Sequence, residues 1–413
     1  MRSRPMALTV SACVLAPGLA LTPPGAFAAA SAEPIGSVRS VAGVAALPPA
    51  DGAVGERRVA FTPTPAARAA VGGAVGGVAA SARGKRVLAT TAAVSIPRDV
   101  AVLGASWVKD SAPGVVFEYR VASGGRWGAW QASDSDPAID ESRSSGARDG
   151  SDAIPVTGAT RVQARLVGTS AAPKDARLTI MSPSSSRADA AAVATAASGG
   201  VGAAGLRSAA GMSGAAALAV SMPMRDPDFP PIRSRGLWKA NERITTRAET
   251  MADPVGFTVH HTAGTNNYTQ AQVPRILRGI QQFHVRDRGW SDIGYNYLVD
   301  KWGGIWEGRR GSFDGHTKGA HTAGLNDSLV GIALLGDYEK VRPSPAAVQR
   351  IARIIAWKSR VIEVDPSGTM WLNGRERPVV VGHRDVGRTS CPGRYLYAQL
   401  PQIRAAATQL RAG

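Results

Sequence analysis

Cysteine is scarce in this chain of 413 residues, which contains only Cys13 and Cys391. A framework of internal disulfides is therefore excluded. Aromatic residues make up only 6% of the sequence, which is low for one continuous core and indicates that part of the chain is not packed. Acidic residues are outnumbered, with 31 Asp and Glu against 48 Lys and Arg, so the formal net charge is +17. This balance favours polyanionic surroundings such as nucleic acid, anionic lipid or an acidic cell wall.

Long apolar runs are also missing. The run over residues 6–21 is too short and too interrupted by proline and glycine to span a bilayer, and no other segment is apolar enough. Two arginines precede it and an Ala-Phe-Ala site follows, so residues 1–28 are typical of a secretory signal peptide. A lipoprotein box at 10–13, with Cys13 as the lipidated residue, is the alternative, but apolar sequence continues past it. We therefore expect a secreted, cell-wall-associated protein.

Composition divides the remaining chain into four segments. Residues 29–84 are rich in Ala, Gly, Val and Pro without a sustained period, which is typical of a low-complexity leader. Residues 85–183 contain alternating apolar and polar stretches that predict a small all-β sandwich. Residues 184–224, mostly Ala, Gly and Ser, indicate a flexible linker. In residues 225–413 strands and helices alternate, which predicts an α/β domain with a mixed central sheet flanked by helices, able to fold independently.

An acidic, serine-rich stretch at 133–153 interrupts the predicted sandwich. Asp134 and Asp136 hint at calcium, but their spacing does not complete a calcium loop. The stretch is therefore interpreted as a solvated loop.

The histidines are confined to the last segment. All six of them, together with Cys391, lie between positions 260 and 391, and such clustering favours a metal site over scattered structural roles. If residues 255–261 form a strand, His260 and His261 point to opposite faces, so only one of them can reach a given metal. The other is expected to form hydrogen bonds within the domain.

A second motif, "GHRDVGRTSCPG" at 382–393, supplies further ligands. The polar, glycine-containing segment between His383 and Cys391 can bring the thiolate back beside the imidazole. Two imidazoles and one thiolate suit Zn²⁺ better than Mg²⁺ or Ca²⁺. Three protein ligands leave the fourth tetrahedral position open for water, which is typical of a catalytic site.

Seven ordered motifs stand out in the last segment. They are "RSRGLWKANE" (233–242), "VHHTAG" (259–264), "FHVRDRGWSDIGYNYLV" (283–299), "WEGR" (306–309), "GAHTAGLN" (319–326), "VGIALLGDY" (330–338) and the motif at 382–393. Together they resemble the peptidoglycan recognition protein family and its relatives, the type 2 N-acetylmuramoyl-L-alanine amidases. The resemblance covers about residues 230–410 and implies a zinc-dependent amidase that cuts the bond between N-acetylmuramic acid and L-alanine.

The resemblance also implies roles for individual residues. The zinc ligands would be His260, His383 and Cys391, which leaves a structural role to His261. Tyr295 would lie next to the zinc and donate a hydrogen bond to the oxyanion that forms on the attacked amide.

The sequence leaves the identity of the general base open. Thr389 stands where phage-type enzymes have a lysine, so it joins the candidate catalytic residues although a neutral hydroxyl cannot supply the charge of an ammonium. Glu307 is a candidate only through its proximity in sequence, and a structural carboxylate is the preferred interpretation.

Five residues lie in motifs that line or flank the muropeptide groove in the family. Arg309 could pair with a stem-peptide carboxylate, although each of the five is nearly as compatible with a structural role. They are His284, Trp290, Arg309, His321 and Asn326.

Three other functions were weighed against the amidase. A non-catalytic peptidoglycan-binding protein is the main alternative, because some family members lose a ligand and only bind. A nucleic-acid partner is suggested by the charge alone, and the export signal argues against it. A glycosidase would need a placed carboxylate pair, which the sequence neither shows nor excludes. We expect a monomer that binds peptidoglycan, its muropeptides and the anionic wall, with no transmembrane segment and no nucleic acid.

Overall fold

The computed structural model describes residues 51–65, 85–133, 147–169, 171–194, 229–246, 249–313 and 315–413. All of these segments belong to one compact unit that spans residues 49–413. The predicted signal peptide, Cys13, the Asp134–Asp136 pair and most of the predicted linker lie outside the described residues. Within the part that is described, no helix is both long enough and apolar enough to cross a membrane.

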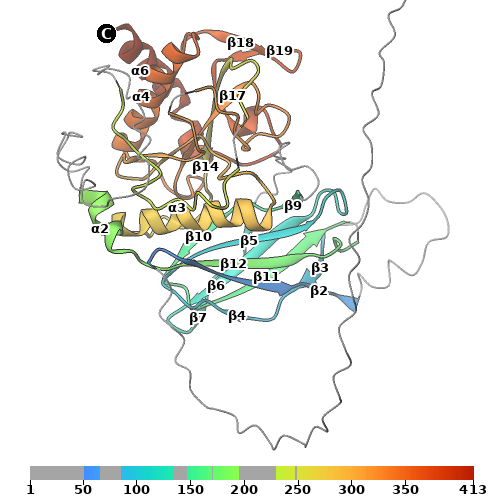
Figure 1. Ribbon diagram of the computed structural model, residues 1–413. Helices are drawn as coiled ribbons and strands as arrows, with labels where there is room; N and C mark the ends of the chain where they lie inside the picture. The colour runs from blue at the N-terminus through green and yellow to red at the C-terminus, as the bar shows by residue number, and fades with distance from the viewer. Residues whose placement is uncertain are drawn as a thin grey trace, which may run out of the picture. The chain divides into compact units, whose positions relative to one another are not determined.

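Two antiparallel sheets form the β domain (Figure 1). Its strands are β1 (Val54–Ala60), β2 (Thr62–Pro63), β3 (Arg86–Thr90), β4 (Val94–Ser95), β5 (Val100–Val108), β6 (Val116–Ser123), β7 (Arg126–Trp127), β8 (Gln131–Ser133), β9 (Arg148–Gly150), β10 (Ile154–Thr157), β11 (Arg161–Gly168) and β12 (Arg177–Pro183). One sheet has the order β1-β12-β5-β10 with β9 also on β5. The other has the order β2-β3-β11-β6-β7, with β4 on β11 and β8 on β6. Buried side chains such as Leu103, Phe117 and Leu166 fill the space between the sheets.

The β domain starts earlier and ends later than the sequence predicted. Strand β1, within the predicted leader 29–84, pairs with β12 from Val54 opposite Pro183 to Ala60 opposite Arg177. Because most of β1 is exposed at the sheet edge, it has no apolar alternation to reveal it. Helix α2 (Arg187–Ala194) lies within the predicted linker 184–224, and its Asp189 is buried. Both boundaries are therefore corrected.

The C-terminal domain is built on a mixed six-stranded sheet. Its strands are β13 (Ile232–Arg233), β14 (Gly256–His261), β15 (Tyr297–Val299), β16 (Ile305–Glu307), β17 (Leu329–Leu334) and β20 (Val380–Gly382), in the order β13-β16-β15-β17-β14-β20. Only the pair β15–β16 is antiparallel. A separate hairpin joins β18 (Thr369–Leu372) to β19 (Arg375–Pro378). The mixed sheet agrees with the α/β prediction.

Helices cover both faces of this sheet. The helical segments are η3 (Gln270–Gln272), α3 (Val273–Gln282), η4 (Phe283–Asp287), α4 (Pro345–Val361), η5 (His383–Asp385), α5 (Arg394–Tyr397) and α6 (Leu400–Ala412). Helices α4 and α6 pack on the face that carries Val299 and Ile332. Helix α3 packs on the opposite face, with Leu298 and Ala333, as expected from strand alternation.

Helix α3 is shared by the two domains. Its sheet-distal side packs on β5 and β12, and Val102 and Met181 of those strands belong to the same apolar cluster as Ile276 and Ile280 (Figure 1). A helix that is buried nearly all round needs cover on every side. The two described domains therefore share one core through α3, and the independent folding of residues 225–413 stays a prediction.

Candidate metal centre

Three metal-binding side chains meet at one edge of the central sheet. His260 is the penultimate residue of β14, and His383 begins η5 directly after β20. These two strands are parallel neighbours, with Val259 opposite Gly382, so their carboxyl ends place the two imidazoles side by side. Their ring centroids are 4.5 Å apart. Cys391 completes the group, and the three ligand atoms all lie within 4.8 Å of one another.

Strand alternation separates the roles of the histidine pair. His260 turns its Nδ1 towards Cys391, with 3.7 Å between Nδ1 and Sγ. The ring of His261 accepts a hydrogen bond from the backbone N–H of Tyr338 at 3.1 Å. The backbone N–H of His261 in turn donates to the Cys391 sulfur at 3.3 Å. His261 therefore forms hydrogen bonds to the backbone of Tyr338 and to the Cys391 sulfur, while His260 offers a ligand atom for a metal ion.

The donor set fits a zinc ion. Zinc bonds of ordinary length in a tetrahedral site put nitrogen and sulfur ligands about 3.6 Å apart, close to the spacing of His260 and Cys391. All three side chains are buried. Burial, with the neighbouring His383 as a second cause, lowers the pKa of His260 well below its ordinary value. The imidazole is therefore in the neutral form that binds metals.

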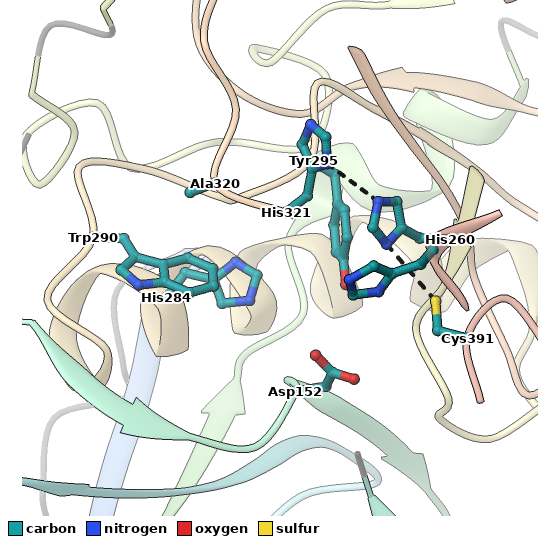
Figure 2. A pocket seen from close by; sticks show the side chains of 9 residues that line it. Asp152, His260, His284, Trp290, Tyr295, Ala320, His321 and Cys391 are labelled. Atoms are coloured by element: carbon teal, nitrogen blue, oxygen red, sulfur yellow. Dashed lines mark hydrogen bonds between the residues drawn. The ribbon is translucent and has the colours of Figure 1, made fainter. Parts of the chain in front are cut away.

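His321 determines which ring nitrogen of His260 is available to bind a metal ion (Figure 2). A carbonyl only accepts, so the contact of His321 Nε2 with Leu329 O at 3.1 Å makes that nitrogen the donor. Burial lowers the pKa of His321 to about 3, so its Nδ1 carries a lone pair and accepts from His260 Nε2 at 3.2 Å. His260 therefore keeps its Nδ1 unprotonated towards the metal position, which is the orienting effect of a ligand's outer hydrogen bond.

A cavity of about 10 Å³ lies beside the three ligands, with room for about one water molecule. The Tyr295 side chain runs towards it, with its ring centroid 5.4 Å from that of His260 (Figure 2). His284 and Trp290 form one wall, with ring centroids 4.5 Å apart. The complete lining is Asp152, His260, His284, Trp290, Tyr295, Ala320, His321, His383 and Cys391.

Three predicted site residues do not line this cavity. Arg309 is 1% exposed and donates to Ile293 O at 3.0 Å, so the expected pairing with a stem-peptide carboxylate is corrected to a buried structural role. The Asn326 side-chain oxygen accepts from the backbone N–H groups of His321 and Thr322, both at 2.9 Å. The Thr389 hydroxyl accepts from Cys391 N at 3.0 Å and so shapes the ligand loop.

Sequence reasoning missed two residues of the cavity wall, Ala320 and Asp152. Asp152 comes from the segment between β9 and β10 of the β domain, and its carboxylate points into the cavity (Figure 2). Its neighbours in sequence are acidic and rich in serine, which is typical of a solvated loop. No local pattern links it to histidines more than a hundred positions away.

Glu307 is a buried carboxyl group outside the cavity. Burial raises its pKa to about 7, against the opposing influence of Arg235. The folded chain therefore binds a proton that the unfolded chain has lost once the pH exceeds the ordinary value of 4.5. The contribution of the protonated Glu307 to the free energy of unfolding is therefore fully present below pH 4.5, and it is lost as the pH rises through 7. We expect Glu307→Gln to unfold like wild type at pH 4.5 and to be more stable at pH 8, by up to about 3 kcal/mol.

Urea unfolding of the zinc-free chain at pH 4.5, 6 and 8 measures this difference. Glu376→Gln is the matched control, because Glu376 is exposed on β19, and its profile should follow wild type. Parallel profiles for wild type and Glu307→Gln would show that Glu307 is not the titrating group.

Comparison with known proteins gives matches over the same region. The family model described as "N-acetylmuramoyl-L-alanine amidase" matches residues 250–394. Peptidoglycan recognition protein 1 of Bos taurus is 33% identical over 173 residues, which cover 41% of this chain and 83% of that protein. Peptidoglycan-recognition protein SC2 of Drosophila melanogaster is 32% identical over 159 residues, covering 38% and 79%.

Two further matches differ in coverage. Human peptidoglycan recognition protein 3 is 34% identical over 169 residues, which cover 41% of this chain but only 45% of that protein. The crystal structure of human PGRP-IBETAC in complex with glycosamyl muramyl pentapeptide is 29% identical, with a TM-score of 0.35, and covers 41% of this chain and 93% of its own. The chain belongs to the family of peptidoglycan recognition proteins and type 2 N-acetylmuramoyl-L-alanine amidases.

Proposed function

We propose that this protein is an exported, zinc-dependent N-acetylmuramoyl-L-alanine amidase that hydrolyses the amide between N-acetylmuramic acid and L-alanine in peptidoglycan. The observation that carries the proposal is the convergence of His260, His383 and Cys391 beside the Tyr295 side chain. Two imidazoles and one thiolate leave one position of a tetrahedral ion for water or substrate. A purely structural zinc site would use four protein ligands.

The chain's own residues supply orientation and charge stabilisation. A zinc ion held by the three ligands would supply a Lewis acid that lowers the pKa of a coordinated water and polarises the amide carbonyl. His321 holds His260 in the tautomer that keeps Nδ1 for the metal. Tyr295 donates a hydrogen bond from its hydroxyl group to the carbonyl oxygen as negative charge develops there. Thr389 and Glu307 both lie off the cavity wall, so neither supports a role as general base.

The substrate follows from the family and from charge. The named relatives are peptidoglycan recognition proteins, and the formal net charge of +17 attracts the chain to an anionic wall. Non-catalytic peptidoglycan binding is the alternative function. The complete ligand set favours hydrolysis, because a protein that only binds has no need of an open metal site.

Mass analysis of digested peptidoglycan distinguishes the two functions. Purified protein loaded with zinc should release peptides with a free L-alanine amino terminus and should create no new reducing sugar. The same protein stripped of metal serves as the blank. Tight binding to peptidoglycan with no new amino termini would favour the alternative, and new reducing ends would indicate a glycosidase.

A further inference from the structure

The cavity beside the ligands is closed on one side by the chain's own β domain. Asp152 and Ala153 belong to the segment between β9 and β10, and both are in contact with the C-terminal domain, Asp152 at the cavity and Ala153 in the core shared with α3. A space of about 10 Å³ accepts about one water molecule, whereas a sugar with an attached peptide needs hundreds of Å³. The substrate of the proposed reaction cannot enter while this segment is in place.

This segment is held at both of its ends. At the β9 end, Arg288 donates from Nε to Arg148 O and from Nη1 to Ser151 O, both at 2.9 Å. At the β10 end, the backbone N–H of Thr265 donates to Pro155 O at 2.9 Å. Arg288 follows η4, and Thr265 lies in the loop that leaves β14 directly after the histidine pair. The two clamps therefore fix the segment on opposite sides of Asp152.

Three ion pairs lie across the same interface. Arg278 of α3 forms two hydrogen bonds of 2.9 Å with Asp189 of α2, and both side chains are almost fully buried. Arg275 pairs with Asp99 at 2.6 Å, in front of β5. Arg177 of β12 pairs with Asp287 of η4 at 2.9 Å. The bidentate and desolvated pair of Arg278 and Asp189 is costly to break one partner at a time, so the interface is a specific one.

We propose that the β domain is an inhibitory module of this enzyme, which docks over the substrate face and places Asp152 in the mouth of the metal site. The proposal rests on the proposed amidase function, because it concerns access to that site. The occupant of the substrate face is the chain's own segment 148–157. The closed form of the enzyme is latent, and hydrolysis by the wild-type chain comes from the small population in which the β domain has moved away from α3.

Gly104 offers a way to test this without touching the site. It lies on β5, and a methyl group at this position would overlap with the Phe283 ring at the end of α3. Overpacking of a closed interface costs about 1–3 kcal/mol, so we expect Gly104→Ala to raise the open population about 5- to 150-fold. Gly55→Ala is the matched control, because its methyl group would make only ordinary contact, 3.6 Å from Ser182 O. Asp99→Ala is a second variant, which weakens the hold on Arg275 without a steric clash.

Two readouts are compared in the full chain, with circular dichroism to verify folding. The first is the rate at which iodoacetamide alkylates Cys391 in zinc-free protein, read from the mass of its tryptic peptide. Cys391 is 3% exposed and lines the cavity that Asp152 also lines, so this rate should rise when the β domain moves away. The second is hydrolysis of a soluble muropeptide by the zinc-loaded protein. Both rates should rise in Gly104→Ala and in Asp99→Ala, and neither should rise in Gly55→Ala.

The remaining outcomes test the inhibitory role and the amidase function separately. Folded Gly104→Ala and Asp99→Ala chains with unchanged alkylation and unchanged hydrolysis would overturn the inhibitory role. Faster alkylation with hydrolysis equal to that of wild type would also overturn it, because the β domain would then not restrict the substrate. Faster alkylation with no hydrolysis in any chain would support closure and would contradict the proposed amidase function instead.

Discussion

The Cys391→Ser variant is expected to lose nearly all bound zinc, whereas the wild-type chain should hold one zinc ion per molecule. The thiolate is the only soft ligand of the three, and a serine hydroxyl stays protonated at neutral pH and binds zinc poorly. Outer-shell changes alone weaken metal binding 10- to 100-fold, so removal of a ligand should cost at least about 100-fold in affinity. Hydrolysis should fall with the metal content.

Metal analysis after gel filtration measures the stoichiometry. Serine is close to cysteine in size, and the backbone N–H of His261 that donates to the sulfur can donate to the hydroxyl, so the fold should persist. The control is His316→Asn, because His316 lies outside the ligand group and is partly exposed. Full zinc content in Cys391→Ser, or loss of zinc in His316→Asn, would remove the three-ligand assignment.

The Tyr295→Phe variant is expected to lose about 10²- to 10³-fold in kcat, which corresponds to roughly 3–4 kcal/mol of transition-state stabilisation. The phenyl ring keeps the packing against His260, so folding and zinc content should hardly change. KM should also change little, because the hydrogen bond to the carbonyl oxygen forms mainly in the transition state.

The measurement is kcat, KM and bound zinc for both chains on one purified muropeptide. Domain closure affects the two chains equally, since both carry the same β domain, so the ratio of their kcat values remains informative. Tyr338→Phe is the control, because Tyr338 is buried and its hydroxyl donates to Leu335 O, away from the cavity. A kcat for Tyr295→Phe near that of wild type would leave Tyr295 as a core aromatic residue.

The sequence was informative for features that depend on a local pattern of residues. Strand alternation predicted that His260 and His261 serve different purposes, and the hydrogen bonds of His261 agree. The mixed sheet followed from alternating strands and helices. The resemblance supplied the choice of His260 within the pair, which alternation alone left open.

The sequence was misleading where a contact depends on distant residues. Strand β5 reads "VAVLGASWV" without alternation, because Leu103 faces the core of the β domain while Val102 faces α3. Both faces are apolar, so the period of two disappears. For Arg309 the local pattern pointed to the wrong partner. A charged residue in a groove motif suggested contact with a ligand, but the guanidinium group donates to buried carbonyl groups. Asp152 carries no signal, since only tertiary packing brings it to the histidines.

Helix α3 limits how the C-terminal domain can be recombined with other modules. A chimera that keeps residues 229–413 and replaces the β domain would expose Phe283 to water and leave Arg278 without the carboxylate of Asp189. Gly279, now packed against Val102, would become a solvent-facing glycine in the middle of a helix, where alanine is more stable by about 1 kcal/mol. The C-terminal domain therefore cannot be separated from the β domain by a cut in the linker alone, because side chains of the two domains pack against each other. To exchange the β domain, the outer face of α3 would have to be redesigned first, and the junction between the two domains would be chosen afterwards.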